Sequence, residues 1–297
     1  MLTRHFSRTA SILIALLVTF LWSTSFVIIK IGLSEIPPLT FAGLRYALAF
    51  ICLLPFAFRK ERVAEIKKLD GKNWAKLVLL GFMFYSFTQG AQFVGLSLLH
   101  AVSVSLLLNF TPIIVAVMGF FLLSEKPTAL QWSGAFLFMV GILAYFYPVD
   151  LSGGETLGVL VMIIGVLANS GSAIMGREIN RSRLHDPLTV TVISMGVGSI
   201  VLLAAGLIAQ GLPSISLTNI LLLAWLAIVN TAMAFTLWNL SLRTLTAMES
   251  SIINGTMLIQ IAILAWIFLG EAISLKEVAG MLIAAIGALL VQLKRKV

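Results

Sequence analysis

The sequence predicts an all-α integral membrane protein with ten transmembrane helices, arranged as two inverted repeats of five helices. Of the 297 residues, 60% are hydrophobic and only 11% are charged, whereas a soluble domain carries about 25% charged residues. The apolar residues fall into segments of about 20 residues, the length that spans a bilayer as a helix. The two halves of the chain also match each other, which is typical of membrane proteins built from internal repeats.

The repeat has a nearly constant spacing of 146 residues. The pairs at this spacing are Ala101 and Ala247, Ser105 and Ser251, Leu123 and Leu269, Glu125 and Glu271, Gly134 and Gly280, and Gly141 and Gly287. Near the start of each half, Trp22-Ser-x-Ser aligns with Asn169-Ser-x-Ser at a spacing of 147. We therefore expect one repeat in residues 1–150 and a second in residues 151–297.

Ten apolar segments are expected to span the membrane, five in each half. They lie at residues 10–31, 38–58, 74–96, 101–123, 129–148, 156–177, 187–209, 217–239, 246–269 and 275–293. The connections between them are short, which leaves no room for a soluble domain.

The distribution of Lys and Arg predicts the orientation of these spans. With a cytoplasmic N-terminus, 17 of the 20 Lys and Arg residues fall on the cytoplasmic side, as the positive-inside rule requires. Both termini are then cytoplasmic, and because five is odd, the second repeat is inverted. A site near the pseudo-two-fold axis is then accessible from either side when one half rocks against the other. Orientation, not nucleic-acid binding, explains the net charge of +8.

Sequence patterns of catalysis are absent. The chain has no zinc-ligand run, no Gly-x-Ser-x-Gly motif and no phosphate-binding loop, and its single cysteine, Cys52, lies in an apolar segment. We expect no metal, no cofactor and no enzymatic activity, so any active transport is driven by a gradient or by exchange. An intramembrane enzyme or a membrane scaffold is the alternative from another class.

Polar residues inside the spans are the candidates for a substrate pathway, because a polar group in hydrocarbon needs a partner or a watery cavity. Tyr85, Gln89 and Gln92 share one face of the third span at helical spacing. They either contact a substrate or hold the bundle together through interhelical hydrogen bonds.

The ninth span carries Glu249, Thr256 and Gln260 on one face. Glu249 has two interpretations. It is either a protonatable carboxylate that binds a substrate amine or exchanges a proton, or an interfacial residue paired with Arg243 or Arg177.

In the fourth span, Pro112 breaks the backbone ladder and frees the carbonyl near Leu108. That carbonyl and Asn109 form either a polar notch at mid-depth or part of a fixed kink. Trp22, Asn169 and Trp238 complete the candidate substrate-binding residues, and the position of Trp22 well inside its span favours a cavity wall or gate.

Other polar and small residues are assigned mainly structural roles. Arg45 is expected to cap carbonyls or to anchor near Lys30 and Glu35, with binding of a substrate carboxylate as the alternative. Glu125 and Glu271 are expected to bond the N-terminal amides of the next helix. The stripe of Gly280, Ala284 and Ala288 permits close packing within the chain or with a second copy.

Several short motifs occur together, in order and partly duplicated. They are Leu21-Trp-Ser-Thr-Ser-Phe26 followed by Lys30, Leu44-Arg-Tyr46, Asn109-Phe-Thr-Pro112, and the sequences Leu-Ser-Glu125 and Leu-Gly-Glu271, each with a glycine nine residues later. In these motifs the sequence resembles the drug/metabolite transporter (DMT) superfamily, in its ten-helix EamA-type branch.

The resemblance implies a fold and a function class. Spans one, three, four, six, eight and nine would surround a central cavity, and members mostly export amino acids, related metabolites or toxic compounds across the inner membrane. We therefore expect a small-molecule substrate and a lipid bilayer as partners, with proton coupling left open. A monomer is favoured and a homodimer is allowed. An obligate exchanger or an uptake carrier is the alternative function within transporters.

Overall fold

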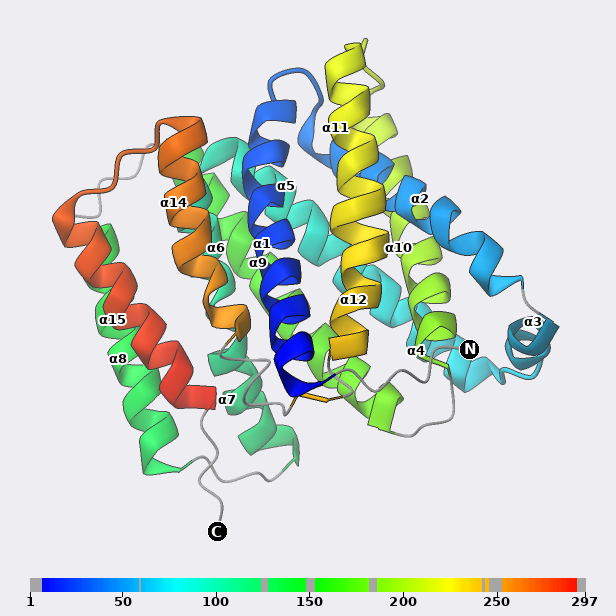
Figure 1. Cartoon of the computed structure of the whole chain (residues 1–297), viewed down its shortest axis with the longest axis horizontal. Helices are drawn as coiled ribbons and strands as arrows, with labels where there is room; N and C mark the ends of the chain where they lie inside the picture. Colours follow the sequence, from blue (N-terminus) through cyan, green and yellow to red (C-terminus); the bar gives the residue numbers. More distant parts are fainter. Residues whose placement is uncertain are drawn as a thin grey trace. The chain divides into compact units, whose positions relative to one another are not determined.

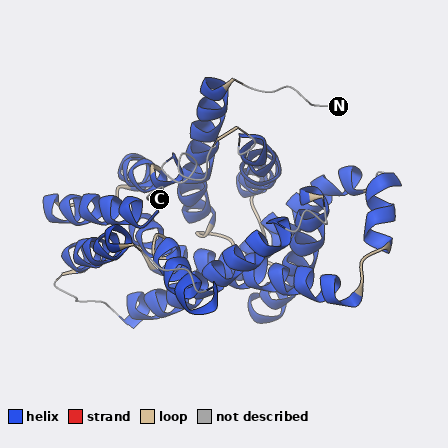
Figure 2. Ribbon diagram, turned by 90° about the horizontal axis from the view of Figure 1, so that it is seen from below, coloured by secondary structure: helices blue, strands red, loops and turns tan. Residues whose placement is uncertain are grey.

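The computed structural model describes residues 7–58, 60–123, 128–147, 153–181, 186–241, 244–245 and 253–292. All the regular secondary structure in these ranges is helical, as the ribbons in Figure 2 show. The helices are α1 (Arg8–Gly32), α2 (Pro38–Ala57), α3 (Lys60–Lys67), α4 (Gly71–Gly81), η1 (Phe82–Thr88), α5 (Gln89–Leu98), α6 (Ala101–Leu108), α7 (Thr111–Leu123), α8 (Ala129–Phe146), α9 (Gly153–Arg181), α10 (Pro187–Gln210), α11 (Leu217–Ala227), η2 (Ile228–Met233), α12 (Ala234–Ser241), α14 (Met257–Leu269) and α15 (Leu275–Gln292). The segments η1 and η2 are π-helical.

Seven helices in the described ranges are long and apolar enough to cross a membrane. Two further apolar helices, Ala101–Val115 and Ile253–Leu269, are shorter. The predicted all-α membrane architecture is therefore confirmed at this level. The described residues of each predicted span are mainly helical, with turns at Asn109–Phe110 and Thr256.

The chain divides into two compact units that do not coincide with the sequence halves. Unit 1 consists of Met1–Val27, Leu99–Thr156 and Met233–Val297, and unit 2 consists of Ile28–Leu98 and Leu157–Ala232. Each unit therefore combines segments from both halves of the sequence.

In unit 1, α8 and α15 lie side by side (Figure 1) in a very close antiparallel contact. A Cβ atom added at Gly134 would lie 2.8 Å from the Gly287 carbonyl oxygen, and one at Gly141 would lie 2.7 Å from the Gly280 oxygen. The Gln131 amide donates to the Val291 carbonyl at 3.0 Å and joins the start of α8 to the end of α15. Small residues allow this approach of two backbones.

In unit 2, α2 packs along α10 in a second antiparallel pair. Gly43 lies against the backbone of Leu203, and Gly206 lies against the backbone of Thr40. The Gln210 side chain accepts from the Leu39 amide at 2.9 Å, which satisfies a donor that the first turn of α2 leaves without a helical partner.

Candidate functional site

Four spans contain interruptions, and these fall at matched positions of the repeat. The π-helix η1 begins at Phe82 and η2 begins at Ile228, 146 residues later. In the fourth span, α6 ends at Leu108 and Asn109–Phe110 form a turn. In the ninth span, residues 253–255 are helical and Thr256, 146 residues after Phe110, is a turn before α14. Interrupted helices at corresponding positions of two halves are characteristic of transporter binding sites.

Threonine hydroxyls stabilise both π-helical segments. Thr88 Oγ1 donates to the Met83 carbonyl at 2.8 Å, and Thr231 Oγ1 donates to the Leu226 carbonyl at 2.8 Å. Each acceptor lies five residues earlier in the chain, the interval that defines a π-helix. The side chains therefore bind carbonyls where the regular ladder changes.

The interruption of the ninth span joins a polar cluster in unit 1, the α14 cluster of Thr19, Ser23, Thr256 and Gln260. Gln260 Nε2 donates to Thr256 Oγ1 at 3.0 Å and to Thr19 Oγ1 at 3.5 Å. Ser23 Oγ donates to Gln260 Oε1 at 2.9 Å. A single glutamine thus connects the turn at Thr256 to one face of α1.

An aromatic group lies on α1 beside this cluster. The Trp22 ring is 5.3 Å from the ring of Phe235 and 5.2 Å from that of Trp238, with tilted geometry in both pairs. All three side chains are half-buried. The predicted candidates Trp22, Trp238, Thr256 and Gln260 therefore contact one another or adjacent positions within unit 1.

A second polar cluster lies in unit 2, the α2 cluster of Arg45, Tyr46, Tyr85, Gln89 and Thr231. Arg45 Nε donates to Thr231 Oγ1 at 3.1 Å, and Tyr46 Oη donates to Gln89 Oε1 at 2.5 Å. The rings of Tyr46 and Tyr85 meet edge to face at 5.6 Å. These residues are buried, and the predicted candidates Tyr85 and Gln89 are both members.

The Arg45 guanidinium also lies over two aromatic rings. Its central carbon is 5.2 Å from the ring centre of Tyr46 and 6.0 Å from that of Phe93. The rings offer their negative faces to a cation that has only 4% of its surface exposed.

The remaining candidates are more dispersed. Asn109 ends α6, where its amide donates to the Ser105 carbonyl at 2.8 Å, and Pro112 occupies the first turn of α7. Gln92 and Asn169 are half-buried in α5 and α9. Glu249 lies outside the described residues, so its two interpretations stay predictions.

Pro112 was expected to create a polar notch or a fixed kink. In the structure the helix is interrupted just before it, by the turn Asn109–Phe110 between α6 and α7. A proline in the first turn of a helix does not remove a helical hydrogen bond, because that N–H has no helical partner. The ninth span is interrupted at the matched place although Leu258 stands where the fourth span has Pro112. The interruption therefore does not depend on proline alone.

The expectation for Glu271 needs correction. Glu271 was expected to bond the next helix, but both of its carboxylate oxygens accept from the Ala101 amide at 2.9 and 3.1 Å, at the start of α6. A carboxylate at a helix N-terminus is favourable whichever helix supplies it. Its repeat partner Glu125 lies outside the described residues. The small-residue stripe of α15 packs on α8 of the same chain, because Gly141 lies against the Ala284 backbone.

Arg45 was expected to cap carbonyls or to anchor near Lys30 and Glu35, and its described contacts include Thr231 and two aromatic rings. Glu35 accepts from the Ser216 amide at 3.1 Å. Hydrogen bonds, first from Asn219 and then from Ser216, lower the pKa of the Glu35 carboxyl below its ordinary value.

The sequence analysis missed Thr19, Tyr46 and Thr231. Tyr46 adjoins Arg45 in the chain, and Thr231 is 146 residues after Tyr85. The repeat spacing itself was therefore the signal that could have identified Thr231 as the partner position of a candidate residue.

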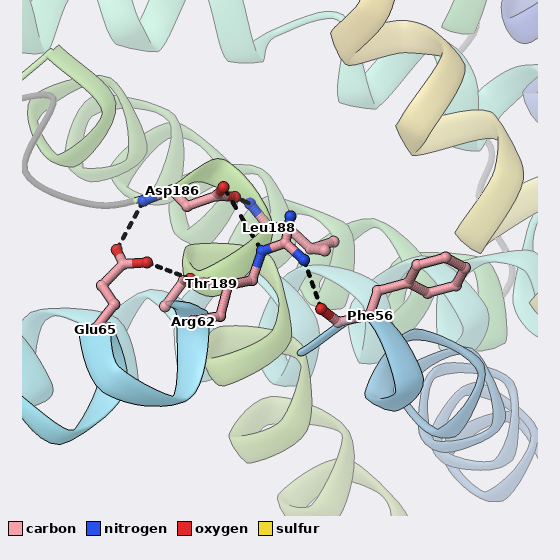
Figure 3. Close-up of polar contacts among 6 residues, drawn as sticks. All are labelled: Phe56, Arg62, Glu65, Asp186, Leu188 and Thr189. Carbon is pink, nitrogen blue, oxygen red and sulfur yellow. Dashed lines mark hydrogen bonds and ion pairs between the residues drawn. The ribbon is translucent and has the colours of Figure 1, made fainter. Parts of the chain in front are cut away.

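A charged network joins α3 to the start of α10 within unit 2, as Figure 3 shows. Glu65 accepts from the Asp186 amide at 2.8 Å and from the Thr189 hydroxyl at 2.9 Å. Arg62 Nε is 3.6 Å from Asp186 Oδ2, and its Nη1 donates to the Phe56 carbonyl. This network fixes the connection between α2 and α4.

A second ion pair joins α4 to α9, where Lys76 Nζ is 2.6 Å from Glu178 Oε1. The hydrogen bond and the charge of Lys76 lower the pKa of the Glu178 carboxyl. No group of three or more His, Cys, Asp or Glu side chains that could hold a metal ion occurs among the residues that the structure describes.

The sequence model of the EamA-like transporter family matches this chain twice, over residues 9–147 and 156–293. The chain belongs to the EamA-like transporter family. It is therefore a multi-pass membrane protein of a transporter family, and the resemblance to the drug/metabolite transporter superfamily is confirmed.

Individual relatives of this EamA-like chain agree. "Uncharacterized transporter YoaV" from Bacillus subtilis is 25% identical over 280 residues, which cover 91% of this chain and 92% of the relative. "Probable amino-acid metabolite efflux pump" from Salmonella typhimurium is 28% identical over 237 residues, which cover 76% of this chain and 75% of the relative. A solved protein structure with 16% sequence identity has a TM-score of 0.67 and covers 96% of this chain and 98% of that one, which shows a shared fold.

Proposed function

We propose that this protein is a secondary transporter that exports an amino acid or a related small metabolite across the inner membrane by alternating access through a central cavity. The observation that carries the proposal is the matched set of interruptions in spans three, four, eight and nine. Irregular backbone inside a membrane needs partners other than lipid, and transporters use such backbone to bind their cargo.

The α14 cluster is the proposed substrate contact. Gln260 offers an amide that both donates and accepts, and Ser23 and Thr256 add hydroxyl groups at the turn of the ninth span. These neutral groups suit the amine and carboxylate of an amino acid equally, because each can donate or accept a hydrogen bond. A relative named as a probable amino-acid metabolite efflux pump supports this substrate class.

The inverted-repeat arrangement is part of the proposal. The closest part of the contact between α8 and α15 pairs Gly134 with Gly287 and Gly141 with Gly280. A shift of 146 residues exchanges these two pairs, and the helices are antiparallel. A two-fold axis in the membrane plane would produce this pattern, so it supports two inverted five-helix repeats; the cytoplasmic position of both termini rests on the distribution of Lys and Arg.

Flux into proteoliposomes tests the proposal. A pool of labelled L-amino acids is the probe, and transport by the native protein is compared with transport by Ser23→Ala and Ser97→Ala. Ser23 donates to Gln260, whereas the exposed Ser97 donates only within its own helix, to the Val94 carbonyl at 2.7 Å. We expect flux to fall about tenfold for Ser23→Ala, the effect of about 1.4 kcal/mol, and to stay unchanged for Ser97→Ala.

Two results would overturn the proposal in different ways. Absence of flux for every labelled amino acid by folded native protein would reject the substrate class, and equal flux by the two serine variants would reject the α14 cluster as the contact. Flux that requires substrate on both sides of the membrane would favour the alternative of an obligate exchanger. Proton coupling through Glu249 predicts a pH-dependent rate that Glu249→Gln makes independent of pH.

A further inference from the structure

Span eight is shared between the two units, and the boundary lies at the end of its π-helix. Unit 2 ends at Ala232 and unit 1 resumes at Met233, whereas η2 runs from Ile228 to Met233. The chain also crosses between units in α1, at Val27–Ile28, after α5, at Leu98–Leu99, and in α9, at Thr156–Leu157. Both α1 and α9 are regular α-helices, so η2 is the crossing at which a helix changes its hydrogen-bond pattern.

A π-helical turn is a weak point in a helix. Its bonds span five residues in place of four, it is rarely longer than one turn, and it frequently occurs at functional sites. A change of direction in a moving chain segment is absorbed by a few residues that can change their backbone angles. The position of η2, where the chain passes from one unit to the other, therefore suits a hinge within span eight.

Within unit 2, a buried charged residue of α2, Arg45, is hydrogen-bonded to η2. Arg45 Nε donates to Thr231 Oγ1 at 3.1 Å, and Thr231 Oγ1 in turn donates to the Leu226 carbonyl at 2.8 Å. Thr231 is fully buried and Arg45 is 4% exposed. This chain of two hydrogen bonds connects α2 to the Leu226 carbonyl, near the end of α11.

The matched segment η1 also contacts α2, but no unit boundary falls in it. Tyr85 occupies the position 146 residues before Thr231, and its ring packs on Tyr46, the residue after Arg45. Arg45 and Tyr46, which are consecutive in α2, thus contact equivalent positions of the two π-helices: Arg45 contacts Thr231 in η2, and Tyr46 contacts Tyr85 in η1. However, η1 lies wholly inside unit 2, so only η2 combines this contact with a unit boundary.

We propose that η2 is a hinge in span eight and that Arg45 is the positioning residue that holds its unit 2 end through Thr231. Arg45 does not touch the transported molecule in this scheme. It fixes the point from which the rest of span eight turns, and its effect on transport rests on the proposed function given above.

Hydrogen–deuterium exchange of the protein in lipid nanodiscs tests the hinge without any substrate. Thr231→Val keeps the branched shape and removes the hydroxyl, and Thr218→Val is the matched control on an exposed position of α11. We expect the amides of residues 228–233 to exchange about tenfold faster in Thr231→Val and in Arg45→Met, the effect of one hydrogen bond to a charged group. The amides of 82–88 and the control variant should keep native rates.

Flux kinetics separate a positioning role from substrate contact. With labelled amino acids as the probe, Thr231→Val should lower the maximal rate about tenfold and change the half-saturating concentration less than about twofold. The Arg45→Met/Thr231→Val double variant should lose no more than the worse single variant, because the two residues act in series.

The possible results decide between the proposals. Native exchange rates at 228–233 in the near-isosteric Thr231→Val would overturn the hinge, even if Arg45→Met fails to fold. Losses of flux that multiply in the double variant, or a change confined to the half-saturating concentration, would overturn the positioning role. If native protein shows no amino-acid flux at all, the proposed function fails, while the exchange measurement still decides the hinge.

Discussion

The glycine contact between α8 and α15 makes a quantitative prediction for Gly141→Ala. The added Cβ would lie 2.3 Å from the Ala284 backbone nitrogen and 2.7 Å from the Gly280 carbonyl oxygen. The first distance is about 1 Å shorter than an ordinary contact of about 3.4 Å. If α8 and α15 move apart by about 1 Å to relieve the clash, each dispersion contact elsewhere between them loses up to about half of its energy. Because both obstacles are backbone atoms, no side-chain rotation relieves the clash.

We expect Gly141→Ala to lower the free energy of unfolding by about 1–3 kcal/mol, the usual cost of overpacking. This loss would outweigh the helix propensity of alanine, which favours the substitution by about 1 kcal/mol. The unfolding midpoint should fall by about 2–10 °C, measured by thermal unfolding in detergent. Gly154→Ala is the control, because nothing lies within 4 Å of its added Cβ. A midpoint for Gly141→Ala equal to that of Gly154→Ala would refute the close contact.

Three further predictions follow from the polar contacts. Gln260→Leu should reduce amino-acid flux at least about tenfold while the protein remains folded, and flux near the native rate would remove Gln260 from the substrate contact. Glu271→Gln should lower the free energy of unfolding by about 0.5–2 kcal/mol, measured as a lower thermal midpoint, because the Ala101 amide loses its charged acceptor; an unchanged midpoint would contradict this. Glu35 has a lowered pKa, so its contribution to stability is present above its ordinary pKa of 4.5 and is lost as the pH falls through the lowered value. Glu35→Gln should abolish that part of the acid dependence of the midpoint, and an identical pH profile would argue against it.

Much of the fold could be predicted because lipid constrains it strongly. Backbone groups in hydrocarbon must be satisfied within a helix, so segment length and hydropathy placed helices where the structure has them. The repeat spacing also carried information, since Glu125 with Glu271 and Gly134 with Gly280 identified equivalent positions from residue identity alone. Gly280 and Gly287 do meet the other half of the sequence at α8.

The partners of polar residues could not be predicted in the same way. Glu271 caps α6, which is about 170 residues away in the chain, and sequence offers no rule for such long-range choices. The π-helices were missed because their sequences, FMFYSFT and IVNTAM, have no proline and no unusual composition. Their form depends on Thr88 and Thr231 and on tertiary contacts that only a folded chain provides.

Arg45 illustrates the same limit. Its cost in hydrocarbon, about 2.5–3.5 kcal/mol on insertion scales, indicated correctly that it needs partners. The sequence suggested carbonyl groups or the nearby charges of Lys30 and Glu35, and the described partners include a hydroxyl from span eight and two aromatic rings. Spacing along one helix identifies a shared face, and it does not identify what packs against that face.

The pairing of α8 with α15 has a consequence for biosynthesis. Gly141 is translated about 140 residues before Gly280, and at roughly 5–20 residues per second this interval is on the order of ten seconds. During that time α8 sits in the bilayer with its glycine face open to lipid or to other proteins. Truncation before Leu275 would leave this face of α8 without the glycine contacts that α15 supplies.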